Sequence, residues 1–130
     1  MENSCMLKLK ELVFDKILFQ RDGFKNESKL ELEFGYAHEE PSEHDHVAHL
    51  SIKGKKLDEY EFEVSASGYF NVESDDAQTN LILRQNAAAI VFPYIRSQIT
   101  FLTAQPGIDS VVLPPMNVAK LVEEKSKRNE

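Results

Sequence analysis

The feature that most constrains the fold is a change in the spacing of apolar residues after Val72. In Leu57–Val72 apolar and polar side chains alternate, which is typical of a strand with one buried face. One face carries Tyr60, Phe62, Val64, Ala66, Phe70 and Val72, and the other carries Glu59, Glu61, Glu63, Ser65 and Ser67. From Leu83 to Leu102 apolar residues recur at third and fourth positions, which indicates a helix. Strands followed by helices predict the α+β class.

Three segments before Leu57 also have strand patterns. Lys29–Tyr36 and Val47–Gly54 alternate in the same way. Within Met6–Gln20 apolar residues come to occupy both faces, so either a bulge shifts the register or both faces are covered. The connections at residues 21–28 and 54–56 have the length of hairpin turns, while residues 37–45 form a longer loop around Pro41. We therefore expect a four-stranded antiparallel sheet within residues 6–72.

The rest of the chain predicts two helices. A long helix over residues 78–104 ends before Pro106-Gly107, a loop covers residues 105–115, and a short C-terminal helix covers residues 116–126. Pro93 lies inside the long helix, where a proline costs about 3 kcal/mol, so we expect a kink or a break after Phe92. A chain of 130 residues is long enough to form a single domain, residues 1–130, with a buried core.

The length and apolar width of the long helix predict a homo-oligomer. A helix over residues 78–104 is about 40 Å long. A compact domain of this size is only about 36 Å across. Four strands can cover one side of such a helix, and another copy of the chain is the simplest cover for the rest. The candidate interface residues are Ile90, Tyr94, Ile95 and Gln98.

Composition and missing motifs exclude several classes of function. A net charge of −7 argues against nucleic-acid binding. Cys5 is the single cysteine, which suits a reducing compartment, and no apolar run approaches the roughly 18 residues of a membrane span. We expect a cytoplasmic protein without membrane insertion. The glycines are scattered singly and Cys5 has no obvious base as a partner, so we expect neither catalytic residues nor a cofactor.

The histidines are the one cluster with metal-binding chemistry. They are His38, His44, His46 and His49, mixed with Glu39, Glu40, Glu43 and Asp45. One hypothesis is a metal-dependent enzyme or metal sensor that uses His44, His46 and His49 to hold zinc or nickel. The alternative is a solvated polar loop without a metal. The alternative is favoured, because no cysteine joins the cluster and half of it falls in a predicted loop.

The segment NAAAIVFPYIRSQITFLTAQPGIDSVVLPPMNVAKLVEE, residues 86–124, resembles the C-terminal half of SecB, the bacterial export chaperone. The run FPYIR inside a long helix, followed by a proline-containing loop and an LPP exit into a short helix, carries the resemblance. The EVSASGYFNV segment and the preceding strands are similar as well. The resemblance implies a dimer of dimers with the long helices sandwiched between sheets. It also implies an ATP-independent chaperone that holds unfolded precursor proteins and passes them to the motor SecA.

The resemblance also implies where a client would bind. SecB-family clients lie in long grooves walled by the loop after the second strand and the loop between the helices. In this sequence those walls are Tyr36–Asp45 and Gln105–Pro115. The candidate groove residues are Ile108, Val111, Val112 and Leu113, with the aromatic residues Phe34, Tyr36, Tyr69 and Phe101. The alternative for each aromatic residue is an ordinary place in the core.

One departure from the family concerns the acidic surface that contacts SecA. Glu61 and Glu63 match that surface, but Lys16 and Gln20 stand at first-strand positions where the family pattern predicts carboxylates. Lost and reversed charges weaken a docking step that depends on charge. The alternative function is therefore a SecB-like chaperone dedicated to one client, such as the antitoxin of a toxin–antitoxin system, that works without SecA.

Overall fold

The computed structural model describes residues 7–24, 28–72, 80–113 and 117–128, and all of their side chains except those of 80–82 and 125–128. The elements are β1 (Leu7–Arg21), β2 (Glu31–Glu39), β3 (Asp45–Lys56), β4 (Tyr60–Val72), α1 (Asn80–Leu102) and α2 (Val118–Arg128). The predicted α+β fold, four antiparallel strands followed by a long and a short helix, is confirmed. The helix starts predicted at residues 78 and 116, and Pro114-Pro115, lie outside the described residues.

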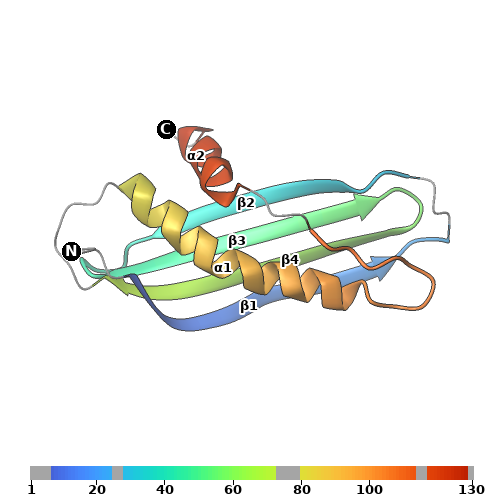
Figure 1. The fold of residues 1–130 in the computed structure, drawn as a ribbon, viewed down its shortest axis with the longest axis horizontal. Helices are drawn as coiled ribbons and strands as arrows, with labels where there is room; N and C mark the ends of the chain where they lie inside the picture. The colour runs from blue at the N-terminus through green and yellow to red at the C-terminus, as the bar shows by residue number, and fades with distance from the viewer. Residues whose placement is uncertain (1–6, 25–27, 73–79, 114–116, 129–130) are drawn as a thin grey trace.

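The helices cover one face of the sheet, which we call the helix side, and the opposite face is the outer face. Figure 1 shows α1 lying diagonally across the strands and α2 above the β2 edge. α1 packs mainly on β3 and β4, and α2 contacts α1 and β2. The predicted inward residues of β4 are all buried in this core. Within the described residues no helix is long and apolar enough to cross a membrane.

The strand order is β1-β4-β3-β2, so β1 and β2 lie at opposite edges of the sheet. The hairpin expected at residues 21–28 is therefore wrong. Its place is taken by a connection across the sheet end, where the N–H groups of Asp22 and Gly23 donate to the carbonyl of Glu59 at 2.9 and 3.1 Å. The turn expected at residues 54–56 is also displaced, because β3 continues to Lys56 and Asp58 takes a φ of 65° in the turn that follows.

β1 carries the irregularity that its sequence predicts. Its pairing with β4 shifts register between Leu9 and Glu11 and again between Phe14 and Lys16. Each shift adds one residue to β1 and returns the apolar side chains to the helix side. The apolar residues that pair opposite the helix-side positions of β4 are Leu7, Leu9, Leu12, Phe14, Ile17 and Phe19. The bulge alternative is confirmed.

Two residues expected on the exposed face of the fourth strand are buried. Glu59 precedes β4 and has an exposed fraction of 1%; its Oε1 lies 3.2 Å from Lys56 Nζ, and this ion pair balances its charge. Ser67 is on the outer face, but neighbouring side chains on β1 and β3 cover it and bond to it. The expectation of a solvated outer face fails at these two positions, because each has a polar partner.

α1 runs without interruption from Asn80 to Leu102 with Pro93 inside it, so of the two predicted outcomes, a kink or a break after Phe92, the break does not occur. Proline removes one hydrogen bond to the carbonyl four residues earlier, that of Ala89. Pro93 and Ala89 are both on the exposed side of α1, where water can bond to that carbonyl. The buried residues among the described side chains of α1 are all apolar: Leu83, Ala87, Ala88, Val91, Phe92, Ile95 and Ile99.

Candidate binding surfaces

The candidate groove residues fall into three environments. Phe34 and Leu113 are buried in the core, Phe34 on the helix side of β2 and Leu113 at the end of the segment that follows α1. Tyr36 is half-buried on the helix side of β2. Tyr69 is on the outer face of the sheet, where it lines a hollow with Lys10 and Pro41. The structure therefore does not bring all four aromatic residues into one groove.

An apolar surface does form where α1 ends and the next segment returns along it. We call it the linker surface and define it as Phe101, Ile108, Val111 and Val112. Phe101 and Val112 have exposed fractions of 75% and 64%. Ile108 and Val111 are half-buried and pack against the core. Among the described residues of the predicted groove, this is the part in which side chains are both apolar and open.

Two threonines hold the linker surface in place. Thr100 Oγ1 donates to the carbonyl of Val111 at 2.9 Å, and the Val111 N–H donates to Thr103 Oγ1 at 2.8 Å. On the other side of the loop, Gly107 takes a φ of 86° and its carbonyl accepts from Arg21 Nη2 at 3.4 Å. These side-chain bonds satisfy backbone groups without a strand or helix, so apolar side chains stay exposed beside the end of α1.

The candidate interface residues on α1 differ in how exposed they are. Tyr94 is 47% exposed, whereas Ile95 has no exposed surface and lies in the core. Ile90 and Gln98 are half-buried. The burial of Ile95 assigns it to the core of one chain, and Tyr94 is the exposed member of the set. Phe14 and Ile17, on the helix side of the edge strand β1, are exposed apolar residues as well.

The outer face of the sheet carries both signs of charge in register. Glu61 on β4 pairs opposite Lys55 on β3 and Gln20 on β1. Glu63 pairs opposite Lys53, and its Oε1 lies 3.0 Å from Lys16 Nζ.

The same rows continue onto β2. Glu31 pairs opposite Lys55, and Glu33 pairs opposite Lys53. Lysines therefore separate the glutamates of β2 from those of β4. The glutamates predicted to contact SecA lie in rows of alternating charge and not in an acidic patch.

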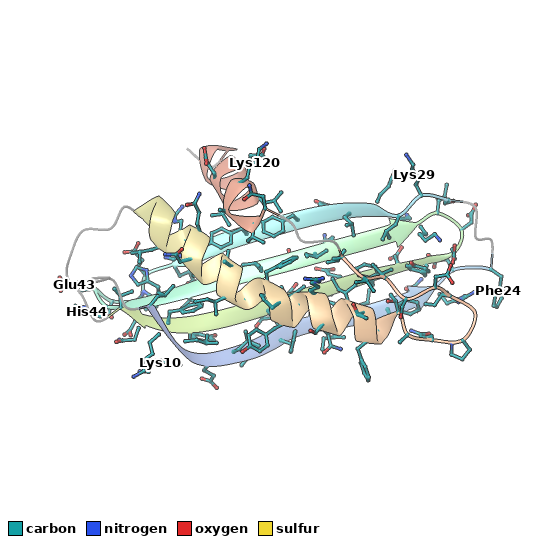
Figure 2. All side chains as sticks on the ribbon, viewed as in Figure 1. Lys10, Phe24, Lys29, Glu43, His44 and Lys120 are labelled. Atoms are coloured by element: carbon teal, nitrogen blue, oxygen red, sulfur yellow. The ribbon has the colours of Figure 1, made fainter. Side chains whose placement is uncertain are left out.

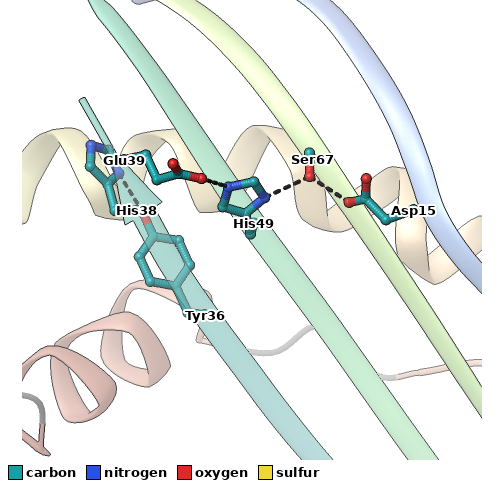
Figure 3. A network of polar contacts seen from close by, with 6 residues as sticks. All are labelled: Asp15, Tyr36, His38, Glu39, His49 and Ser67. Carbon is teal, nitrogen blue, oxygen red and sulfur yellow. Dashed lines mark hydrogen bonds and ion pairs between the residues drawn. The ribbon is translucent and has the colours of Figure 1, made fainter. Parts of the chain in front are cut away.

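A polar chain crosses the outer face from β2 to β1 (Figure 3). His49 Nε2 lies 2.5 Å from Glu39 Oε2, and His49 Nδ1 lies 2.6 Å from Ser67 Oγ. Ser67 in turn donates to the carboxylate of Asp15 on β1. Because the chain joins residues from all four strands, it helps to explain why Ser67 is buried among polar partners.

A second polar cluster lies on the helix side and contains Tyr36, His38 and His46. The Tyr36 hydroxyl is 2.9 Å from His38 Nδ1, and His38 Nε2 is 2.9 Å from His46 Nδ1. The same hydroxyl donates to the carbonyl of Arg84 on α1 at 3.4 Å. Burial lowers the pKa of His38 to about 4, with smaller effects from His46, Arg84 and His49, and burial raises the pKa of Tyr36. His38 is therefore a neutral imidazole at neutral pH.

The structure does not bring His44, His46 and His49 together into one site. His46 and His49 point to opposite faces of β3. His44 precedes β3, and its Nδ1 lies 3.0 Å from the carbonyl of Val72. Figure 2 shows His44 at the end of the sheet away from Phe24. The partner that the sequence reasoning missed is His38, which needs the register of β2 with β3 to be placed beside His46.

The cluster predicts a pH dependence of stability in metal-free buffer. The folded pKa of His38 lies below the ordinary value of 6.5, so the unfolded chain binds a proton that the folded chain does not. The contribution of His38 to the free energy of unfolding should therefore be fully present above about pH 6.5 and should be lost as the pH drops toward about 4. Because solvent screens a half-buried group, we expect the free energy of unfolding to fall by about 1–2 kcal/mol over this pH range.

Urea unfolding with a chelator present, across that pH range, checks this prediction. His38→Gln keeps a polar side chain but does not titrate, so its stability should change less with pH than that of the wild type. Equal pH profiles for the two proteins would contradict the assignment.

A four-stranded antiparallel sheet under one long and one short helix, with an open apolar linker beside the long helix, is the architecture of SecB-like chaperones. The sequence model described as preprotein translocase subunit SecB matches residues 9–129. The chain therefore belongs to the SecB family. An uncharacterized protein of Methanocaldococcus jannaschii is 27% identical over 98% of this chain and 86% of its own length.

Solved structures are similar in fold. One is the SecB-like chaperone Rv1957 of Mycobacterium tuberculosis, in complex with a ChAD peptide from the HigA1 antitoxin. It has a TM-score of 0.68 and 14% identity, covering 85% of this chain and 90% of that one. A second is a protein of unknown function from Streptococcus agalactiae, with a TM-score of 0.52 and 10% identity, covering 87% of this chain and all of that one. At these identities the two structures support the SecB-like fold.

Proposed function

We propose that this protein is an ATP-independent chaperone that binds unfolded segments of a client through the linker surface. The observation that carries the proposal is the exposure of Phe101 at the end of α1 and of Val112 on the following linker, whose backbone is held by threonine side chains. An unfolded chain has no fixed side-chain pattern, so a protein that holds it must rely on apolar burial and main-chain pairing. The linker surface offers apolar side chains without a strand or helix to cover them.

The binding energy of one such surface is modest. Burial of roughly 400 Å² of client apolar area contributes on the order of 10 kcal/mol at about 25 cal/mol per Å², and the ordering of the client offsets most of it. A homotetramer would present several surfaces to one long client, so avidity would supply much of the affinity. The exposed Tyr94, Phe14 and Ile17 support such an assembly, because a second copy would cover them.

Two versions of this function differ in the partner. Export chaperones would deliver precursors to SecA through an acidic surface, and a dedicated chaperone would serve one client. The alternating charges favour the dedicated version, since Lys53, Lys55 and Lys16 face the glutamates that would otherwise attract a basic partner. The structural similarity to a chaperone that holds an antitoxin peptide fits a client of that kind. The Sec export version is the second candidate.

Two measurements test the proposal. Aggregation of a chemically unfolded model protein, followed by light scattering, should be suppressed by stoichiometric amounts of this protein. No suppression at several-fold excess would reject it. Mass spectrometry of proteins co-purified from the native cell separates the two versions. One dominant small partner supports the dedicated chaperone, whereas a broad set of precursors together with SecA supports export.

A further inference from the structure

We propose that His38, His46 and Glu40 form a zinc site at the end of the sheet where β2 and β3 meet the first turns of α1. The ligand atoms of these three residues all lie within 4.8 Å of one another. Two imidazoles and one carboxylate are a donor set that zinc accepts, with water in the fourth position. The site does not depend on client binding, and it differs from the sequence-based set of His44, His46 and His49.

The two histidine nitrogens already face each other. His38 Nε2 and His46 Nδ1 are 2.9 Å apart. Zinc–nitrogen bonds of about 2.0 Å at a tetrahedral angle place two ligand nitrogens about 3.3 Å apart. A zinc ion would therefore require the two nitrogens to separate by a few tenths of an ångström and the rings to turn until both lone pairs point at the metal. His46 is buried, so it cannot turn away easily from this position.

The hydrogen bonds around His38 favour a lone pair on its Nε2, the nitrogen that faces His46. The Tyr36 hydroxyl donates to the carbonyl of Arg84 at 3.4 Å and lies 2.9 Å from His38 Nδ1, an arrangement that favours a proton on Nδ1. With the proton on Nδ1, the lone pair on His38 Nε2 accepts the hydrogen bond from His46 Nδ1, so the proton of His46 must move to its Nε2 or to solvent when zinc binds. A histidine ligand held through its other nitrogen in this way is the common arrangement in metal sites. Tyr36 is thus a positioning residue for the metal ligand.

Charge near the site acts in both directions. The guanidinium of Arg84 acts on His38 and opposes a divalent cation. The carboxylate of Glu40 carries the compensating negative charge and comes from an exposed position just after β2. We therefore expect affinity below that of a four-ligand structural zinc site. Occupancy would fasten the connection between β2 and β3, residues 40–44, to the sheet.

The test is a zinc titration of the tag-free, chelator-treated chain by calorimetry. The expected result is one zinc per chain. Glu40→Gln changes an exposed residue and should keep the fold, and it should weaken binding by at least about tenfold. His38→Ala should abolish the site. His49→Ala is the matched control, because His49 lies on the opposite face of β3 and should not affect binding.

Two further measurements distinguish this site from zinc bound elsewhere on the protein. Cobalt in place of zinc should give the absorption of a tetrahedral nitrogen–oxygen site, and Tyr36→Phe should weaken zinc binding about tenfold while the circular dichroism stays unchanged. Equal zinc affinity in the wild type, Glu40→Gln and His38→Ala would overturn the proposal. A loss in His49→Ala equal to that in His38→Ala would also overturn it, since metal would then be bound elsewhere.

Discussion

Ile95→Asp is expected to abolish cooperative folding of the domain. Ile95 has no exposed surface and packs in the core between α1 and the sheet. Loss of a buried isoleucine side chain costs about 2–5 kcal/mol, and a buried carboxylate without a partner adds several more. A domain of this size is stable by only about 5–15 kcal/mol. Circular dichroism during heating should show no cooperative transition in the variant.

Tyr94→Asp is the matched control for this change. The substitution places the same charge one residue earlier on α1, at a position that is 47% exposed. The variant should keep the wild-type dichroism spectrum and unfold cooperatively. If an oligomer uses this side of α1, light scattering should report a smaller mass for Tyr94→Asp. A folded Ile95→Asp variant beside an unfolded Tyr94→Asp variant would reverse the assignment of the two faces.

The double substitution Phe101→Ser and Val112→Asp is expected to remove most of the affinity for an unfolded client. These two side chains are the most exposed members of the linker surface, and neither lies in the core. Removal of two large apolar contacts, each worth about 1.5–3 kcal/mol when fully buried, should weaken binding at least about tenfold per site. Because neither residue supports the fold, the melting temperature should change little.

Ser110→Asp is the control for the linker. It places a carboxylate on the same loop at an exposed position that is already polar. Client affinity, measured by the fluorescence anisotropy of a labelled unfolded protein, should stay near the wild-type value. A loss in Ser110→Asp as large as that in the double variant would mean that any charge on the loop is harmful, and the assignment to apolar contacts would fail.

The fold could be predicted from the sequence because its elements are long and regular. The alternation through Tyr60–Val72 and the helical spacing after Leu83 each depend on local residues. Apolar residues on both faces of the first strand allow either a bulge or a strand covered on both sides, and the pairing with β4 decides for the bulge. By contrast, the uninterrupted helix at Pro93 depends on the exposure of Ala89 and Pro93, which the local sequence does not report.

The parts that could not be predicted depend on pairing between distant segments. The position of β1 beside β4 moves β2 to the other edge and removes the expected hairpin. The same long-range register places His38 beside His46 and sets Lys53 against Glu63. Without this register the sequence groups Tyr69 with the groove residues, although Tyr69 lies on the outer face of the sheet. The exposure of Val112 follows from a loop that resists regular structure, and the role of the linker surface in client binding stays a prediction.

The salt dependence of client binding tests the central claim most directly. Raising the ionic strength from about 0.1 M to about 1 M shortens the screening length from about 10 Å to about 3 Å, which weakens contacts between exposed charges. Apolar contacts persist under these conditions. We predict that the affinity for an unfolded client is retained in high salt and is lost in the Phe101→Ser, Val112→Asp variant. Affinity that collapses in high salt and is unchanged in the variant would show that the charged outer face holds the client instead.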